Sequence, residues 1–358
     1  MSLPRSIRII HLAPPTETTS RKRRGFAGGL TGAVASLVAM QADDLVSVRV
    51  SSAREVDLPS DLPTVLHVHH ALAWPEAQLL AARLDAPTIY TVHVLQARQS
   101  RLRGLDPATP TRSETLEAQA LAEATRVTVA TDAALASLLM DHPTLARDKV
   151  RLASFAPRLP CLPRAPAAAP TVLAATRFDA LKGIDLLVAL AARLLTDPRH
   201  PDLRFVLAGG LPENARAEAR WLDTLRAAVP ETAHARLHLP GWLGPDALAA
   251  ALASAHVYVS ASRIETLGLG LLEALAAGCP AVATDLDVHR EVAASARLVP
   301  ATADALANAI LESLQGPAPM PSSPSPSASQ ADWRAPWIAL WRELGASQGS
   351  ARGCVENP

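Results

Sequence analysis

Short β-branched segments alternate with longer alanine- and leucine-rich segments along this chain, and the alternation occurs twice. In the first half, the predicted strands are 7–11, 45–50, 65–68, 88–92 and 127–130, and the predicted helices are 30–40, 75–84, 114–123 and 133–140. In the second half, the predicted strands are 171–176, 204–208, 236–239, 257–260 and 281–284, and the predicted helices are 184–195, 213–228, 245–254, 269–277 and 303–314. Such alternation favours parallel sheets covered by helices on both faces. The sequence therefore predicts an α/β fold of two doubly wound, Rossmann-like domains facing a cleft.

Two proline-rich segments divide the chain. The segment 155–170 holds five prolines in sixteen residues, and 316–330 is rich in proline and serine. Both patterns are typical of linkers. We predict an N-terminal domain at 1–155, a linker at 156–170, a second domain at 171–315, a linker at 316–330 and a returning C-terminal helix at 331–358.

The C-terminal helix carries tryptophan at every fourth position. Trp333, Trp337 and Trp341 form one aromatic stripe. Apolar stripes of this period usually face a protein core, so we expect this stripe to pack on the body of the N-terminal domain. A stacking platform for a ligand is the alternative.

The charge balance bears on the possible partners. The 358 residues contain 34 Lys and Arg against 34 Asp and Glu, with a formal net charge of zero. A nucleic-acid binder normally shows a basic excess, so none is expected as a partner. Only three lysines are present, Lys22, Lys149 and Lys182, in a chain otherwise dominated by arginine.

Cysteine usage and hydropathy point to a cytoplasmic protein. Cys161, Cys279 and Cys354 are far apart and form no metal-ligand spacing or even disulfide set. The longest apolar stretch, 267–284, is interrupted by Glu273 and Pro280, so it does not suit a membrane span. Membrane contact is expected to be peripheral at most.

Two glutamates flank a predicted helix start in the second domain. Glu265 follows a predicted strand and Glu273 lies in the next helix, with Gly268 and Gly270 between them. Free amides at a helix N-terminus attract phosphate, and glycines let it approach. Carboxylates beside such a site suit sugar or ribose hydroxyls, so the pattern favours a sugar nucleotide. Ordinary acidic residues near the positive end of a helix are the alternative.

Two cations follow the first predicted strand of the same domain. Arg177 ends the strand and Lys182 precedes the next helix. Two fixed cations beyond the carboxyl ends of parallel strands can bind a diphosphate and stabilise its charge as it departs. A pair that only solubilises the loop is the alternative.

The N-terminal half carries weaker signals. Gly28 and Gly29 open a predicted helix and would permit close backbone approach to a ligand. The basic segment Arg21, Lys22, Arg23 and Arg24 precedes them and would suit an acceptor bearing phosphate or carboxylate, or would simply be solvated.

Histidines and an acidic pair complete the candidates. His67, His69 and His70 cluster at one strand end and His93 follows the next strand, and of these His93 is assigned a functional role. Zinc is not favoured there, because no cysteine or carboxylate completes a ligand set. Asp285 and Asp287 have the D-x-D form of some metal-dependent transferases, but no metal is assigned to them.

Taken together, the chain resembles the GT-B glycosyltransferases, and within them glycosyltransferase family 4. The shared features are a glycine pair after the first strand, R-x4-K-G before a helix, and E-x7-E opening a later helix. The resemblance covers nearly the whole chain and is strongest over 171–314. The chain departs from the family at Thr266 and Leu267, where Pro or Gly and Phe are frequent, and at 285–287, where T-D-x-G-G is usual.

The resemblance implies roles for individual residues. Arg177 and Lys182 would grip the donor diphosphate, Glu265 would face the donor sugar, and Glu273 would bind the ribose. The backbone at Gly268 and Leu269 would contact the donor, as would Gly28 and Gly29, and the segment ending at Leu243 would read the base. His93 would lie by the donor sugar, so the expected catalytic set is His93, Glu265, Arg177 and Lys182.

We therefore predict a retaining, metal-independent glycosyltransferase without a cofactor. It would move a hexosyl-type group from a nucleotide diphosphate sugar to a hydroxyl of a small acceptor, such as an envelope precursor, a glycolipid or a secondary metabolite. The alternatives are a nucleotide-sugar epimerase of the same fold and a non-catalytic sugar-nucleotide-binding protein.

Overall fold

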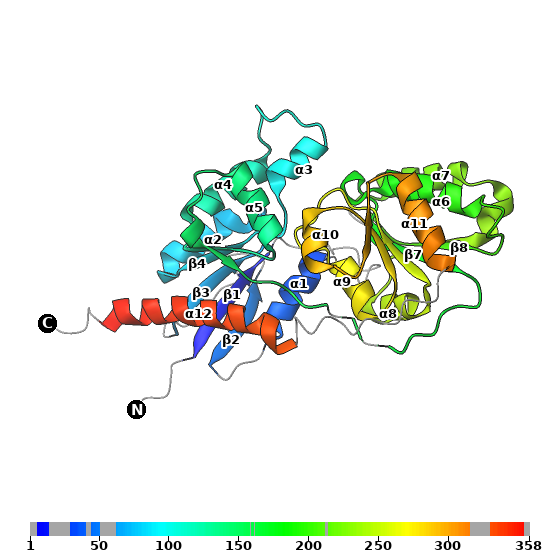
Figure 1. Ribbon diagram of the computed structural model, residues 1–358. Coiled ribbons are helices and arrows are strands. Elements are labelled where there is room, and N and C mark those ends of the chain that lie inside the picture. The colour runs from blue at the N-terminus through cyan, green and yellow to red at the C-terminus, as the bar shows by residue number, and fades with distance from the viewer. Residues whose placement is uncertain are drawn as a thin grey trace. The chain divides into compact units, whose positions relative to one another are not determined.

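The computed structural model of the chain describes residues 6–13, 29–40, 44–50, 62–157, 159–160, 162–211, 214–315 and 330–353. The chain divides into two compact units, and each is described by itself. The N-terminal unit comprises Met1–Phe155 with Ser327–Pro358, and the C-terminal unit comprises Ala156–Pro326. Figure 1 colours both units by residue number.

The N-terminal unit contains a six-stranded parallel sheet. Its strands are β1 (Ile7–Leu12), β2 (Leu45–Val50), β3 (Thr64–Val68), β4 (Thr88–Thr91), β5 (Arg126–Val129) and β6 (Val150–Leu152), in the order β2-β1-β3-β4-β5-β6. Its helices are α1 (Gly29–Val38), α2 (Trp74–Leu84), α3 (Gln96–Leu102), α4 (Arg112–Glu123), α5 (Asp132–Asp141) and α12 (Gln330–Gly353). The sequence pattern did not predict β6 or α3, which are short.

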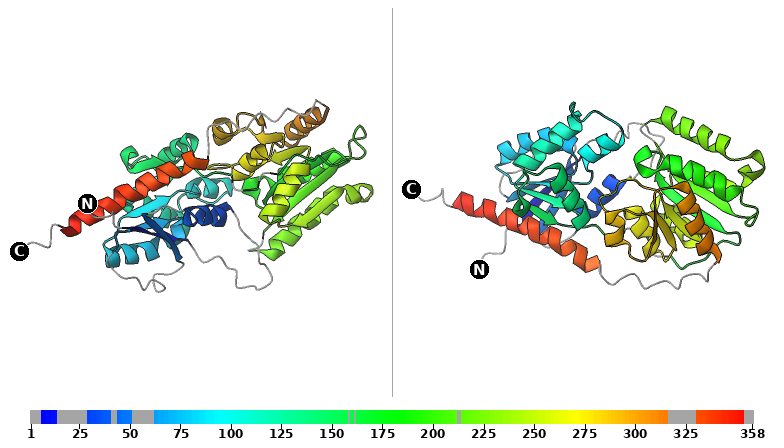
Figure 2. Two further views of the ribbon diagram at one scale, coloured as in Figure 1. Left: turned by 90° about the horizontal axis from the view of Figure 1, so that it is seen from below. Right: turned by 45° about the horizontal axis from the view of Figure 1, so that its top comes forward.

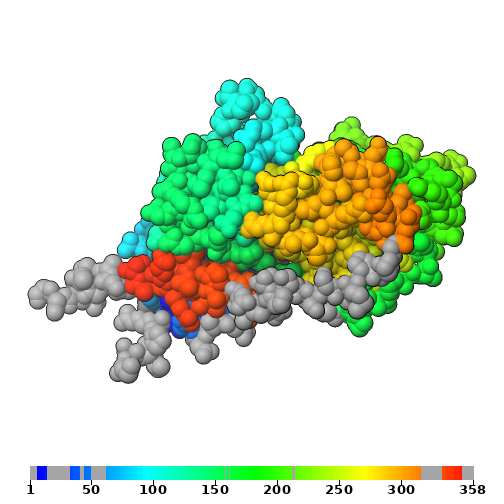
Figure 3. Space-filling model, in the orientation of Figure 1, coloured from blue at the N-terminus to red at the C-terminus, as the bar shows by residue number. Residues whose placement is uncertain are grey.

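Helix α12 returns to the sheet of the N-terminal unit and contacts β1 and β3. Trp337 and Trp341 are fully buried, and the Trp337 ring nitrogen donates a hydrogen bond of 2.9 Å to the Ser154 carbonyl. Further along, the Gln348 amide oxygen accepts from the Thr64 backbone N–H at 2.6 Å. Figure 3 shows α12 in red along the surface of this unit. Burial of two indole rings makes α12 an integral part of this unit.

The C-terminal unit contains a second six-stranded parallel sheet. Its strands are β7 (Thr171–Arg177), β8 (Arg204–Gly210), β9 (Leu237–Gly241), β10 (Val257–Ser260), β11 (Ala281–Thr284) and β12 (Arg297–Val299), in the order β12-β11-β10-β7-β8-β9. Its helices are α6 (Ile184–Leu195), α7 (Ala215–Ala228), α8 (Pro245–Ser254), α9 (Leu269–Ala276), α10 (Asp287–Val292) and α11 (Ala303–Gln315). The short elements α10 and β12 were not predicted.

Alternating side chains of this sheet form two separate cores. Val172, Val257 and Val259 pack with residues of α6, α7 and α11. Their neighbours Leu173 and Tyr258 pack with residues of α8 and α9 on the opposite face. Figure 2 shows helices on both faces of this sheet. The period of two along each strand therefore produces a doubly wound unit.

The two sheets confirm the predicted fold class of two Rossmann-like domains. Among the described residues, none of the helices combines the length and the apolar character needed to span a membrane. Gly28 and the basic segment Arg21, Lys22, Arg23 and Arg24 lie outside the described residues, so their predicted roles rest on the sequence alone.

Candidate functional site

The strand order of the C-terminal unit identifies one edge for ligand binding. Counted from β7, the order is the 3-2-1-4-5-6 arrangement, whose direction reverses between β7 and β10. Ligands of such sheets bind beyond the carboxyl ends of the strands at this reversal. Arg177 is the last residue of β7, and Ser262 and Glu265 follow β10. Three polar side chains therefore follow the two strands that form the switch point.

Lys182 and Glu265 are in direct contact at this edge. The Lys182 Nζ lies 2.6 Å from Glu265 Oε1, and the Ser262 hydroxyl donates to the same oxygen at 2.8 Å. The two side chains keep 31% and 16% of their surface exposed. Burial acts to raise the pKa of Glu265, but the Lys182 ammonium and the Ser262 hydroxyl outweigh it, and the pKa lies below its ordinary value. Glu265 is therefore held as a carboxylate.

The glycine after Lys182 allows this contact. Gly183 has a φ of +68°, and a Cβ at this position would lie 2.0 Å from the Ala261 carbonyl oxygen. A side chain here would push apart the segments that carry Lys182 and Glu265. The steric limit at Ala261 therefore explains why glycine follows Lys182 in the sequence motif.

A second ion pair joins the same two segments. The Arg263 backbone N–H donates to the Leu181 carbonyl at 2.8 Å, and its guanidinium pairs with both oxygens of Asp185 at 2.6 Å. Asp179 begins the 3-10 turn Ala180–Lys182 by accepting from the Leu181 N–H at 2.9 Å. These backbone and side-chain hydrogen bonds together fix the position of the backbone from which the Lys182 side chain extends.

Helix α9 presents its N-terminus at the same edge. Gly268 precedes it with a φ of +79°, and among the described residues no side chain caps the helix. The first amides of such a helix attract anions. The His289 ring lies against Gly268, because a Cβ there would be 3.3 Å from its Cδ2. His289 is fully buried, and its Nδ1 lies 2.7 Å from the Thr284 carbonyl oxygen, which can only accept.

The remaining predicted donor residues belong to β7, to α9 and to the segment after β9. Arg177 is exposed at the end of β7, and Glu273 is half-buried in α9. Burial raises the pKa of Tyr258, and the charges of Glu273 and Glu265 raise it further. Leu243 follows β9 and packs against the core around Tyr258. The structure thus brings Lys182 and Glu265 into contact, while Arg177 ends β7 and Glu273 belongs to α9.

The D-x-D pair is engaged by an arginine. Both oxygens of Asp285 accept from Arg290, at 2.7 and 2.6 Å, and Asp287 accepts from the same guanidinium at 2.7 Å. A divalent cation would have to displace this guanidinium.

The N-terminal unit has its own group of polar side chains at a strand reversal. Its order changes direction between β1 and β3, and His11 and His69 lie there, with His93 just after β4. His69 contacts both others, at 3.0 Å to His11 and 3.1 Å to His93. His70 instead accepts from the Leu72 N–H and begins a 3-10 turn. Gly29 is the first residue of α1.

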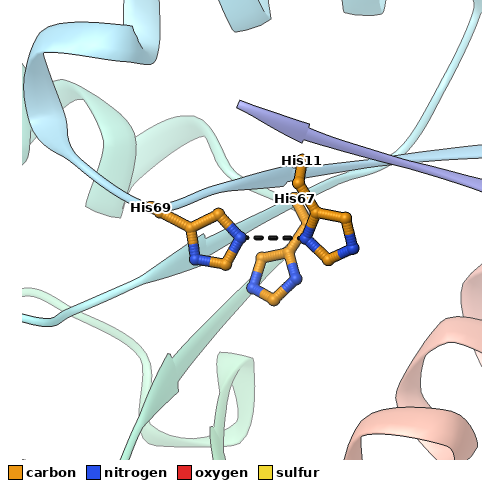
Figure 4. A group of neighbouring side chains, drawn as sticks. All are labelled: His11, His67 and His69. Atoms are coloured by element: carbon orange, nitrogen blue, oxygen red, sulfur yellow. Dashed lines mark hydrogen bonds between the residues drawn. The ribbon is translucent and has the colours of Figure 1, made fainter. Parts of the chain in front are cut away.

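Three of these histidines could approach a metal ion. One nitrogen from each of His11, His67 and His69 lies within 4.8 Å of the others (Figure 4). The nitrogens of His11 and His69 already face each other across a hydrogen bond, which a metal would have to replace.

Sequence reasoning missed several of these residues. Ser262, Arg263 and His289 act through contacts that no local motif displays. His11 meets His69 from 58 positions away, and only the pairing of β1 with β3 brings them together.

Known proteins resemble parts of this chain in sequence. Residues 169–316 match the family model described as Glycosyl transferases group 1. A D-inositol 3-phosphate glycosyltransferase of Stackebrandtia nassauensis is 32% identical over 233 residues, which cover 61% of this chain and 52% of that protein. A phosphatidyl-myo-inositol mannosyltransferase of Mycolicibacterium smegmatis is 35% identical over 172 residues, 46% of this chain and 41% of that protein. The chain thus spans about half the length of the curated relatives it matches.

Solved structures share the fold over almost the full chain. A sucrose-phosphate synthase of Thermosynechococcus elongatus superposes with a TM-score of 0.68 at 19% identity, covering 97% of this chain and 98% of that one. The HepE protein of Anabaena, solved in complex with UDP and glucose, superposes with a TM-score of 0.68 at 14% identity. The match covers 98% of this chain and 99% of that one. The fold is therefore that of the GT-B glycosyltransferases, as the resemblance predicted. The match to the family model Glycosyl transferases group 1 lies within the C-terminal unit.

Proposed function

We propose that this chain is a glycosyltransferase that moves a hexosyl-type group from a nucleotide diphosphate sugar to a hydroxyl of a small acceptor, with retention of configuration. The observation that carries the proposal is the Lys182–Glu265 contact of 2.6 Å at the strand reversal, beside the N-terminus of α9. It places a cation, a carboxylate and helix amides at one edge. These are the groups that a sugar diphosphate requires.

The diphosphate is proposed to bind Arg177, Lys182 and the amides at the start of α9. Fixed cations and a helix N-terminus stabilise the negative charge that develops on the leaving diphosphate. The contact with Glu265 already fixes the position of the Lys182 ammonium. Donor binding therefore does not have to order a mobile lysine side chain. Preorganised charges of this kind lower the barrier without reorganising during the reaction.

The two glutamates are proposed to bind hydroxyl groups. Glu265 accepts hydrogen bonds from the donor sugar, and Glu273 accepts them from the ribose. Since the Lys182 ammonium and the Ser262 hydroxyl both engage Oε1 of Glu265, which makes that oxygen a poorer nucleophile, we assign Glu265 to sugar binding and not to covalent attack. We propose that the acceptor hydroxyl attacks from the face of the departing phosphate, whose oxygen takes the proton. His93 is proposed to assist at the donor sugar.

The relatives support a proposal for the donor and the acceptor. Two relatives are named for inositol-containing acceptors, and the Anabaena structure holds UDP and glucose. We propose a uridine diphosphate sugar as donor and a small polyol acceptor, with a phosphate if Arg21, Lys22, Arg23 and Arg24 take part. A location in the cytoplasm and a mechanism without metal or cofactor are part of the same proposal.

A thermal-shift panel of UDP-, GDP-, ADP- and dTDP-sugars tests the donor site. A ligand that binds only the folded state at 100 times its dissociation constant adds about 2.7 kcal/mol to stability. We expect one donor to raise the melting temperature of the wild type and of Arg193→Ala, but not of Lys182→Ala. Arg193 is the matched control, because it pairs with Asp304 on the surface of the same unit. A shift that survives in Lys182→Ala contradicts the site.

Product analysis with the same donor separates the functions. Transfer of the sugar to an acceptor supports the proposal. Epimerised donor, or binding without turnover over a broad acceptor panel, would support the alternatives instead.

A further inference from the structure

Three histidine rings of the N-terminal unit form a hydrogen-bonded row. The Nδ1 of His11 lies 3.0 Å from the Nε2 of His69. The Nδ1 of His69 lies 3.1 Å from the Nε2 of His93. Figure 4 shows the first of these contacts as a dashed line. The row runs from the core of the sheet to His93, the residue predicted to act at the donor sugar.

The strand register explains why the rings meet. His11 in β1 lies opposite His67 in β3, so both side chains share one face of the sheet. His69 follows on the same face two positions later, and its backbone N–H donates to the Leu12 carbonyl at 2.9 Å. The rings of Trp337 and Trp341 pack on this face from α12, at 5.1 Å from His67 and 5.6 Å from His11. His11 and His69 are fully buried beneath this cover, and His93 is half-buried at the end of the row.

All three rings are neutral at physiological pH. Burial lowers the pKa of His11 to about 3, and the positive charge of Arg49 on β2 lowers it further. Burial also holds the pKa of His69 well below its ordinary value, with His67, His11, His93 and Arg49 adding to the effect. For His93, burial and then the neighbouring His70 lower the pKa to about 3. Each ring therefore carries one ring proton.

Three ring protons and two ring-to-ring bonds leave two arrangements. In the first, His11 Nδ1–H donates to His69, His69 Nδ1–H donates to His93, and His93 carries its proton on Nδ1. In the second, each ring carries its proton on Nε2. His93 then donates to His69, His69 donates to His11, and His93 Nδ1 carries no proton. A mixed arrangement would leave His69 with two protons or none, and burial disfavours either charge.

The buried end of the row distinguishes the two arrangements. The Nε2 of His11 has no hydrogen-bond partner among the described residues. The second arrangement would place an unpaired N–H there, whereas the first leaves only an unpaired acceptor. Buried N–H groups without a partner are the rarer of the two.

We propose that His11 and His69 form an imidazole relay that holds His93 in the tautomer with its proton on Nδ1 and its Nε2 accepting. His11 and His69 are positioning residues that act through His93, and their catalytic consequence rests on the proposed function. With the proton on Nδ1, His93 donates a hydrogen bond from that atom and does not serve there as a base. Reversing the tautomer of His93 requires reversing both other rings.

Nitrogen-15 NMR of the histidine rings in the ligand-free full chain tests the relay. Couplings between ring nitrogens and carbon-bound protons report which nitrogen carries the proton, and His93→Gln assigns the His93 signals by their loss. The expected result is His93 protonated on Nδ1 in the wild type. A wild-type His93 protonated on Nε2 would overturn the proposal.

Two variants separate the relay from general packing. His69→Leu removes the central ring and is expected to move the His93 nitrogen signals away from the pure Nδ1–H pattern. His67→Leu is the control. His67 lies in β3, two positions before His69, and is equally buried on the same face, but it bonds to the Thr91 hydroxyl, 2.6 Å away. It should leave the His93 pattern unchanged. An unchanged pattern in His69→Leu, with melting and circular dichroism like those of His67→Leu, would also overturn the relay.

The kinetic consequence is measured separately. If His93 acts at the donor sugar, His69→Leu should lower kcat at least ~10-fold with little change in KM for the donor, since misplaced proton donors of this kind cost turnover. The NMR result needs no activity, so failure of the relay and failure of the proposed function are distinguishable.

Discussion

Lys182 and Glu265 are 83 positions apart in the chain, yet their charged atoms lie 2.6 Å from each other at the carboxyl edge of the second sheet. The contact joins the segment after β7 to the segment after β10. These are the two strands between which the strand order reverses, so the pair marks the place where an α/β sheet binds its ligand.

Replacing Lys182 by alanine should abolish most transfer. The change removes a cation that the proposal assigns to the leaving diphosphate, and single charge-stabilising groups of this kind are worth ~10²-fold or more in turnover. We expect at least that loss in kcat, measured with saturating donor. Arg193→Ala, which removes an exposed cation of the same unit, should keep wild-type kcat. Near-normal transfer by Lys182→Ala would refute the assignment.

Gly183→Ala should destabilise the C-terminal unit. The new Cβ would meet the Ala261 carbonyl oxygen at 2.0 Å in a backbone of positive φ. Strain and overpacking together should cost about 2–5 kcal/mol in urea unfolding. Gly241→Ala is the control, because its φ is +73° but nothing lies within 4 Å of the added atom. It should lose only ~1–2 kcal/mol. Equal losses of unfolding free energy in the two variants would mean that the backbone at Gly183 and Ala261 can move apart at little cost.

Chelation of divalent metal should leave transfer intact. Asp285 and Asp287 are both held by the Arg290 guanidinium, and the diphosphate charge is assigned to Arg177, Lys182 and α9. We expect the same rate with and without EDTA. A loss of activity that only a divalent cation restores would assign the D-x-D pair to metal binding.

Glu117 should make the stability of the N-terminal unit depend on pH. Burial raises the pKa of this α4 carboxyl to about 8, against an ordinary value of 4.5. Between these values the native chain keeps a proton that the unfolded chain has lost. The free energy of unfolding contributed by this group is therefore complete below pH 4.5, falls as the pH rises, and levels off above 8.

The variant Glu117→Gln isolates this effect. A neutral amide keeps the shape of the carboxyl group. Its oxygen can accept from the Gln96 N–H, and its NH2 can donate to the Tyr90 hydroxyl, which bonds to the other oxygen of Glu117 in the wild type. Wild-type unfolding free energy should fall relative to the variant by up to ~4 kcal/mol between pH 5 and 8. Parallel pH profiles for the two proteins would show that Glu117 is ionised in the native state.

Local patterns were enough to predict most of the fold. Buried parallel strands read as short β-branched runs, and 45–50, 257–260 and 281–284 match the structure at both ends. The three-residue strands β6 and β12 were missed, because so short a segment shows no period. Helix α10 was missed because it begins within the D-x-D segment, which had been read as a loop.

The sequence pointed to candidate site residues only where charged side chains come shortly after a predicted strand. Arg177, Lys182 and Glu265 were singled out on this ground. The Ser262 bond to Glu265 and the approach of Gly183 to Ala261 depend on how β7 and β10 pair, which one sequence does not display. The same holds for His11, whose partner His69 directly follows the neighbouring strand β3.

Retaining transfer from a nucleotide sugar can be tested on the product itself. NMR of the product formed from an α-linked nucleotide sugar gives the one-bond coupling between the anomeric carbon and its proton, which reports the new linkage. We expect an α-linked product from the wild type and almost none from Lys182→Ala. A β-linked product, or no transfer of the sugar by the wild type from any donor that binds, would contradict it.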